Sequence, residues 1–296
     1  MTDLITIFCQ IDDFCKEFEK QFQKKLLSVG TGKRKRSMIL TASEVMTISI
    51  WYHFSGFANF KDFYTKHVQI YLKNCFPKLP SYTRFIELRK MIIVPLLTFL
   101  STKKLGTCTG VSFIDSFKIE ACHTKRISSH KTLKNIARRG KTSVGWFYGL
   151  KVHLVFNHKG EILAFHITAG NVADNNQKVL FQLTKNLTGK LFGDKGYLVK
   201  QSIFEQLYRQ GLQLITKVRS NMKSKPIEMI DKLLLQKRGI VESAGDILKN
   251  HLFMEHSRHR STWGAILHIF TSLTAYQFRD KKPSISSDLS NKLLYA

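Results

Sequence analysis

The segment Lys190–Tyr197 constrains this chain more than any other stretch. Leu191 and Phe192 are typical of the end of a buried strand, and the two glycines that follow allow the backbone to turn sharply. Asp194 lies between those glycines, so we expect it at the carboxyl edge of a sheet. Open α/β sheets carry their ligand sites at that edge. The segment therefore predicts an α/β fold with an acidic side chain in its site.

Two further acids are predicted on regular elements. Asp115 follows the apolar run Val111–Ile114, which predicts a strand that ends in a carboxylate, and Glu242 lies in the helical segment Lys237–Lys249. Magnesium prefers oxygen ligands and keeps several waters, so a few carboxylates suffice to bind it. Divalent ions stabilise the attacking and leaving oxygens when a phosphodiester bond is hydrolysed or transferred. Asp115, Asp194 and Glu242 therefore predict a metal site that acts on DNA.

The charge of the chain favours a polyanionic partner. Its 296 residues include 47 Lys and Arg against 21 Asp and Glu, a formal net charge of +26. This excess is typical of nucleic-acid binding first and of anionic membrane surfaces second. The longest apolar run, Met91–Leu100, contains a proline and is too short to span a bilayer. Five cysteines without a CxxC pair argue against a disulfide framework, and early acidic residues argue against a signal peptide, so we expect a cytoplasmic protein.

Residues 1–105 are predicted to form an all-helical DNA-binding region. Aromatic residues recur at helical spacing before residue 30, and Thr41–Glu44 is a capping-box pattern. The basic run Gly30–Arg36 is either a solvated linker or a contact with DNA phosphates. Two prolines precede a basic helix at Ser81–Lys90, which is typical of helix-turn-helix DNA binding and also of ordinary helical domains.

Strand patterns begin after a connector near Lys104 and predict the order β, β-hairpin, α, β, α, β, α. The first strand is expected at Val111–Ile114 and the last helix at Trp263–Phe278. A polar tail follows from Asp280. The intervening elements are predicted at residues 147–156, 161–168, 177–187, 190–192, 199–210, 212–218 and 227–249, the last with a break near Gly239.

Clusters of basic residues supply candidate DNA contacts. The stretch Lys118–Ser143 is predicted to be a long loop, and such loops are usually functional or disordered. Lys195, next to Asp194, is equally consistent with a phosphate contact and with a solvent-facing side chain. Arg238, Glu242 and Lys249 are spaced by four and seven residues, which predicts one helical face carrying two cations around an acid. The candidate DNA-binding residues are Arg138, Arg139, Lys195, Arg238, Lys249, Arg258 and Arg260.

These motifs together resemble the bacterial insertion-sequence transposases of the DDE type, and the chain is most similar to the branch called family nine-eight-two. Arg238, Glu242 and Lys249 match the Arg-x3-Glu-x6-Lys part of a signature that many relatives begin with Tyr. Leu235 stands where that Tyr would fall. The other segments that carry the resemblance are Phe113–Ser116, Thr168–Asp174, Phe192–Tyr197, Glu255–Arg260 and Trp263.

The resemblance implies an RNase H-like mixed sheet flanked by helices over residues 106–279, after the helical region 1–105 and before a tail at 280–296. It implies metal-dependent cleavage at insertion-sequence ends and transfer of the freed 3′ hydroxyl into target DNA. By this resemblance Asp115 would bridge two ions, Mg²⁺ or Mn²⁺, and Asp194 and Glu242 would each complete the coordination of one of them. The implied partners are transposon-end and target DNA and a second copy of the chain in the synaptic complex, in the bacterial nucleoid and not at a membrane.

Two other functions stay open at this point. One is a DNA-binding protein that descends from a transposase and has lost catalysis. The other is a structure-selective nuclease with an RNase H-like fold. Joining of cleaved ends to a target distinguishes the transposase from both.

Overall fold

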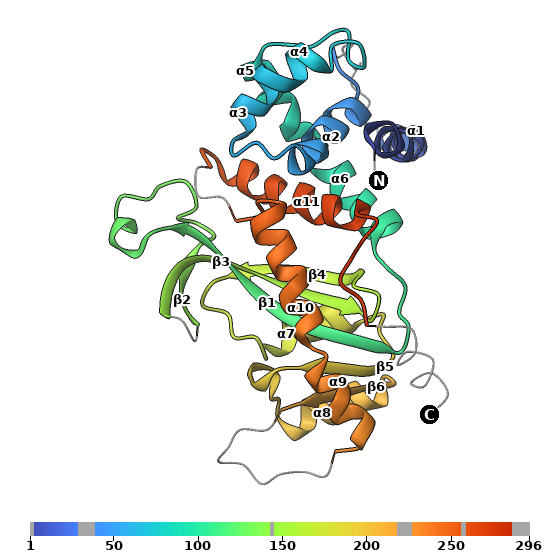
Figure 1. The fold of residues 1–296 in the computed structure, drawn as a ribbon, viewed down its shortest axis with the longest axis vertical. Coiled ribbons are helices and arrows are strands. Elements are labelled where there is room, and N and C mark those ends of the chain that lie inside the picture. The colour runs from blue at the N-terminus through green and yellow to red at the C-terminus, as the bar shows by residue number, and fades with distance from the viewer. Residues whose placement is uncertain (1–2, 29–38, 143–144, 218–226, 256–258, 286–296) are drawn as a thin grey trace. The chain divides into compact units, whose positions relative to one another are not determined.

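The computed structural model describes residues 3–28, 39–142, 145–217, 227–255 and 259–285 (Figure 1). They fall into two compact units. The first contains the described residues of Met1–Lys104 together with Asn250–Met254 and Trp263–Asp280, and the second contains those of Leu105–Lys249, Glu255–Thr262 and 281–285. No helix in the described ranges is long and apolar enough to cross a membrane.

The first unit is helical in its described part. The capping box predicted at Thr41 is present, since the Glu44 backbone N–H donates to Thr41 Oγ1 at 3.2 Å and the Thr41 N–H donates to Glu44 Oε2 at 2.6 Å. The helical segments are α1 (Leu4–Ser28), α2 (Ala42–Trp51), η1 (Tyr52–Phe54), α3 (Phe60–Phe63), η2 (Tyr64–Val68), α4 (Gln69–Tyr71), α5 (Tyr82–Arg89), η3 (Lys90–Ile92), α6 (Ile93–Phe99), η4 (Leu100–Lys104) and α11 (Thr262–Phe278).

Helix α11 belongs to the first unit, although the sequence analysis places it in the second region. Its side chains from residue 267 to 278 are all buried. His53 lies beside it: one ring nitrogen is 2.8 Å from Thr271 Oγ1 and the other 2.6 Å from the Leu252 carbonyl oxygen. Burial lowers the pKa of His53 to about 3, so this imidazole is neutral. The place of α11 late in the sequence therefore did not predict the unit to which it belongs.

The predicted basic helix Ser81–Lys90 corresponds to α5 and the start of η3, and Ser81 is its N-cap. Two of its cations make contacts inside the unit: Arg84 pairs with Glu87 at 2.7 Å, and Arg89 lies 4.1 Å over the Phe60 ring. Burial lowers the pKa of Arg89 to about 10. Binding of DNA by this helix stays a prediction, and the basic run 30–36 lies outside the described residues.

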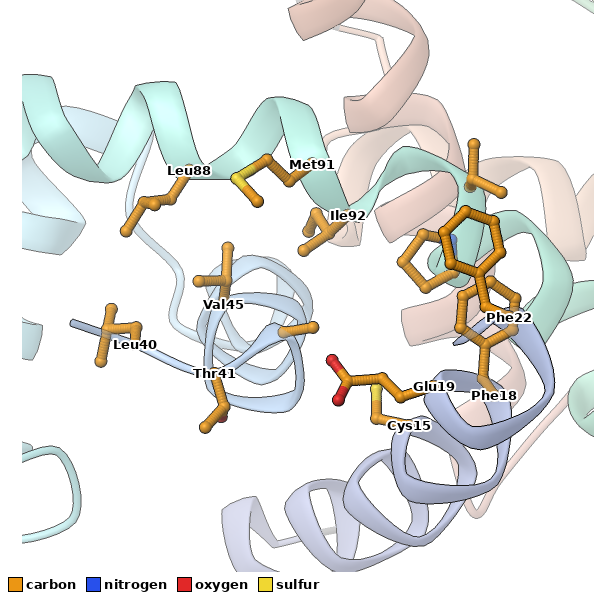
Figure 2. A pocket seen from close by; sticks show the side chains of 13 residues that line it. Cys15, Phe18, Glu19, Phe22, Leu40, Thr41, Val45, Leu88, Met91 and Ile92 are labelled. Atoms are coloured by element: carbon orange, nitrogen blue, oxygen red, sulfur yellow. The ribbon is translucent and has the colours of Figure 1, made fainter. Parts of the chain in front are cut away.

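An apolar cavity of about 300 Å³ opens between helices of the first unit (Figure 2). Glu19 is the charged residue in its lining, and none of the three predicted acids contributes to it. The other lining residues are Cys15, Phe18, Phe22, Leu40, Thr41, Ala42, Val45, Leu88, Met91, Ile92, Val94 and Pro95. The cavity is therefore mostly apolar, and the candidate catalytic groups are the acidic residues of the second unit.

The second unit is built on a mixed sheet of six strands in the described residues. The strand order is β2-β3-β1-β5-β6, and β4 also pairs with β3. β3 is antiparallel to β1, β2 and β4, whereas β5 is parallel to both β1 and β6. The strands are β1 (Val111–Cys122), β2 (Arg138–Thr142), β3 (Gly145–Asn157), β4 (Ile162–Ala169), β5 (Gly189–Gly193) and β6 (Leu212–Thr216).

Different helices cover the two faces of this sheet. Ile114 of β1 packs in one apolar cluster with residues of α7 (Gln177–Thr184) and α8 (Gln201–Arg209). Phe117 points to the opposite face, because side chains alternate along a strand. There it meets Gly245 of α10 (Gly239–Asp246), which lies in front of β1 in Figure 1. The remaining helical segments are η5 (Thr124–Arg126), η6 (Lys195–Tyr197), α9 (Met229–Gln236) and the π-helical turn η7 (Ile247–His251).

The structure corrects two predicted boundaries. The first strand does not end at Asp115: β1 continues to Cys122 because β3 pairs with it along nearly its whole length. The stretch 118–143 is therefore not one loop, since it begins inside β1 and contains η5 and β2. The break expected near Gly239 in the helical segment 227–249 is present: α9 ends at Gln236, α10 begins at Gly239, and η7 follows α10.

Candidate active site

Asp115 and Asp194 come together because β1 and β5 are parallel neighbours in register. Phe113 on β1 is paired with Phe192 on β5. Each acid lies two residues beyond its phenylalanine, so both carboxylates reach the same level of the sheet. The prediction that each acid sits at a sheet edge holds for Asp194, which directly follows β5, whereas Asp115 lies within β1.

The Asp115 carboxylate is held on the face of the sheet that α10 covers. Arg238 Nη2 lies 3.2 Å from Asp115 Oδ2, and the Ser116 backbone N–H donates to Oδ1 at 2.9 Å. Burial raises the pKa of Asp115 to about 6, and the negative charges of Asp194 and Asp174 add to this effect. Arg238 acts in the opposite direction without cancelling the shift. The site therefore holds an acid whose negative charge is incompletely compensated.

Asp194 is fixed by the turn that follows β5. Its Oδ1 accepts the backbone N–H of Gly196 at 2.8 Å and so caps the short helix η6. A Cβ atom on Gly196 would come within 2.9 Å of Asp194 Oδ1 and 3.5 Å of Asp174 Oδ2. The glycine predicted to allow the turn thus also lets two carboxylates approach one backbone segment.

Asp174 is an acid of this site that the sequence analysis did not select. Its Oδ1 accepts a hydrogen bond from Ser116 Oγ at 2.7 Å and pairs with Lys151 Nζ at 3.0 Å. Lys151 is 7% exposed, whereas the Asp174 side chain is 29% exposed, so water reaches the pair from the side of the carboxylate. The pKa of Tyr197 is raised well above its ordinary value by burial and by the charges of Asp115, Asp174 and Asp194. The segment 168–174, already matched to the family motif, was the pattern that could have singled out Asp174.

Glu242 lies in the first turn of α10 and its side chain is exposed. Two residues of the same segment, one before and one after Glu242 in the sequence, contact β1. Arg238, one turn earlier, reaches Asp115, and Gly245, almost one turn later, lies against Phe117. Glu242 therefore lies along α10 between two positions that contact β1, with its own side chain exposed.

The predicted DNA-binding residues have different settings. Lys249 lies in η7 and pairs with Glu255 at 3.6 Å, and the wider π-helical turn interrupts the face expected for Arg238, Glu242 and Lys249. Glu255 also accepts the Glu120 backbone N–H at 3.0 Å. Arg258 lies outside the described residues. The exposed members of the set are Arg138, Arg139, Lys195 and Arg260.

The chemistry of the donors fits a divalent metal ion. Asp115, Asp194 and Asp174 offer carboxylate oxygens, which Mg²⁺ and Mn²⁺ prefer. Burial is the main cause of the raised pKa of Asp115, and the negative charges of Asp194 and Asp174 raise it further. A cation at such a position favours the ionised carboxylates. The described residues contain no group of three or more His, Cys, Asp or Glu side chains arranged to hold a metal ion. The fit therefore rests on the donor set and its charge.

A comparison with known protein families shows which family this chain belongs to. The family described as "Transposase DDE domain" matches residues 105–262, more than half of the chain. The matched range contains Asp115, Asp174, Asp194 and Glu242. No curated protein matches the chain.

Proposed function

Because the chain belongs to the transposase DDE domain family, we propose that it is a DNA transposase that cleaves the ends of an insertion sequence and joins the freed 3′ hydroxyl to target DNA. The observation that supports this most is the register of β1 and β5, which brings Asp115 and Asp194 to one level beside Arg238. We also propose membership of the bacterial branch nine-eight-two, on the motifs quoted above.

We infer that the second unit has an RNase H-like fold. Three antiparallel strands, β1, β3 and β4, are followed by two strands, β5 and β6, on the side of β1 away from β3. Parallel β5 next to β1 is the arrangement that the resemblance implies, with the helix that carries Glu242 against β1. This proposal explains why acids from distant parts of the chain gather at one place.

Asp115, Asp194 and Glu242 are the proposed catalytic acids and the residues that would hold two divalent ions. When bound, such ions would stabilise negative charge on the attacking and leaving oxygens of the phosphodiester. Arg238 orients the Asp115 carboxylate and offsets part of the charge of the neighbouring acids. Lys151 and Ser116 hold Asp174 beside the site, so we assign Asp174 a positioning role.

The net charge of +26 supports DNA as the substrate, because cations that neutralise phosphates release counterions. We propose that Arg138, Arg139, Lys195 and Arg260 contact the backbone of transposon-end and target DNA, with Arg238, Lys249 and Arg258 close to the reacting strand. Two copies of the chain would hold the two ends in a synaptic complex. We propose a nucleoid location, where the DNA substrate is found.

The test is a cleavage and joining assay. The purified chain is incubated with a duplex carrying the inverted repeat that flanks its coding region and with plasmid target, with Mg²⁺ or Mn²⁺ and with a chelator. We expect metal-dependent nicking at the repeat and joined products. Nicking without joining would favour a nuclease, and binding without nicking would favour a transposase descendant that has lost catalysis. Either result overturns the proposal.

A further inference from the structure

An exposed tryptophan lies among cations on the ribbon formed by β2 and β3. The Trp146 side chain is 64% exposed, although large aromatic residues are mostly buried. Its cross-strand partner is Lys141, whose Nζ lies 5.7 Å from the centre of the Trp146 ring.

The two faces of the ribbon differ. Residues directly opposite on paired strands share a face, so Arg139 and Tyr148 lie on the same face as Lys141 and Trp146. Phe147 points the other way and is buried. On that inner face a Cβ atom at Gly140 would collide with the Gly170 carbonyl, so no larger side chain fits there. The outer face thus presents the exposed Arg139, Lys141 and Trp146 side by side.

This combination fits a nucleic-acid strand with an unpaired base. An aromatic face stacks on any base, and neighbouring cations hold the phosphates, which is how proteins bind single strands without reading their sequence. In an intact duplex the bases are already stacked on one another. A tryptophan side chain can therefore stack on a base mainly where base pairing is broken. The charge complements phosphate, since Lys141 lies by the ring, Arg139 lies on the same face, and the whole chain carries +26.

We propose that Trp146 stacks on an unpaired base of the DNA substrate while Lys141 and Arg139 hold the adjacent phosphates. The proposal deepens the proposed function and rests on it, because it assigns a strand-handling site to a protein that breaks and joins DNA. The Lys141 ammonium, 5.7 Å from the ring centre at an exposed position, is loosely held. A stacked base would therefore take its place over the ring and leave Lys141 free to contact a phosphate.

The test measures binding of the full chain to a fluorescent oligothymidine and to a duplex of the same length, in a chelator and at one fixed salt concentration. Trp146→Ala should weaken binding to the single strand roughly tenfold, within the range known for loss of one stacked base. It should change duplex binding less than about twofold, and Trp146→Phe should keep most of the single-strand affinity because it keeps an aromatic face. Lys141→Ala and Arg139→Ala should weaken both and lower the salt dependence.

Trp263→Ala is the matched control, because Trp263 is also exposed, at 58%, and lies in α11 outside the ribbon. It should leave both affinities unchanged. Equal losses on single strand and duplex, no loss for Trp146→Ala, or the same loss for Trp263→Ala would overturn the proposal. Thermal melting of each variant identifies misfolding. The binding assay requires neither metal nor cleavage. The stacking proposal can therefore fail in this assay while end cleavage is observed, and stacking can be observed while end cleavage fails.

Discussion

At the scale of single residues, the acids of the site differ in what surrounds them. Asp115 is partly buried beside Arg238, Asp174 pairs with Lys151, and Glu242 is exposed on α10. A buried carboxylate near other carboxylates is costly to ionise, and a metal ion removes that cost. Charge is therefore the property of these residues that substitutions should test.

Glu242→Gln should abolish cleavage and strand transfer while DNA binding stays nearly intact. Glutamine keeps the size of the side chain and one acceptor oxygen but loses the charge that would bind a divalent ion. We expect a loss of several orders of magnitude in rate, where each factor of ten is about 1.4 kcal/mol of barrier. Single-turnover kinetics and a binding titration at fixed salt measure the two effects.

Asp246→Asn is the matched control, since Asp246 is exposed on the same helix one turn later. It should retain most activity. An active Glu242→Gln protein with an inactive Asp246→Asn protein would show that the wrong acid was chosen. Full activity of both would remove α10 from the site.

Asp115→Asn should stabilise the metal-free protein at pH 7.5 while abolishing activity. The pKa of Asp115 is about 6 in the folded chain and 3.8 as the ordinary value, so the folded state disfavours the carboxylate. The resulting loss of stability is complete above pH 6 and disappears as the pH falls below 3.8. The variant should gain on the order of 1–3 kcal/mol at pH 7.5, since one pKa unit is about 1.4 kcal/mol. Urea unfolding from pH 7.5 to 4 measures the gain, and a gain that does not shrink over this range would contradict the prediction.

At the scale of elements, the packing of α10 on β1 decides where Arg238 and Glu242 lie. Gly245 is the point of closest approach, because a Cβ atom there would overlap the Phe117 ring. Gly239, at the start of the same helix, has open space where its Cβ would be. The two glycines of one helix therefore offer a matched pair of substitutions.

Gly245→Ala should destabilise the protein by about 1–3 kcal/mol, the usual cost of overpacking, and should reduce cleavage by displacing α10. Gly239→Ala should be neutral or slightly stabilising, because alanine favours the helix. Combining Gly245→Ala with Phe117→Leu should restore part of both losses. Thermal unfolding and cleavage rates test this, and equal behaviour of the two alanine variants would refute the packing explanation.

At the scale of the whole molecule, the first unit is completed by segments that lie far along the chain. His53 has its hydrogen-bond partners at Leu252 and Thr271, and Phe99 stacks on Phe278 at 6.1 Å between ring centres. A fragment of residues 1–105 lacks all three partners. The first compact unit therefore consists of the described residues up to Lys104, the boundary that the sequence suggests, together with two segments from much later in the chain.

The fragment 1–105 should not unfold cooperatively and should not discriminate end DNA from random DNA. The fragment would expose the apolar surface that α11 covers in the full chain, and it would also expose His53, which is buried in the full chain. Circular dichroism during heating and binding at fixed salt, with the full chain as reference, measure both properties. A cooperative transition with selective binding would show that α11 is dispensable and would support an autonomous DNA-binding domain.

The sequence by itself determined the local elements and the kind of chemistry. Alternating and continuous apolar runs predicted the strands around Asp115 and Asp194, the capping pattern at Thr41 predicted the start of α2, and the charge predicted a polyanionic partner. These are short-range properties, because strand period, caps and turns depend on neighbouring residues.

Only the tertiary structure decided which distant residues meet. The register of β1 and β5 aligns Asp115 with Asp194, the Asp174 carboxylate finds Lys151 and Ser116, and Arg238 reaches Asp115. The length of β1 depends on its pairing with β3, and α11 joins the first unit, where Thr271 contacts His53 and Phe278 stacks on Phe99. Strand pairing and burial arise from contacts between segments far apart in the chain, so the pattern of any one segment could not specify them.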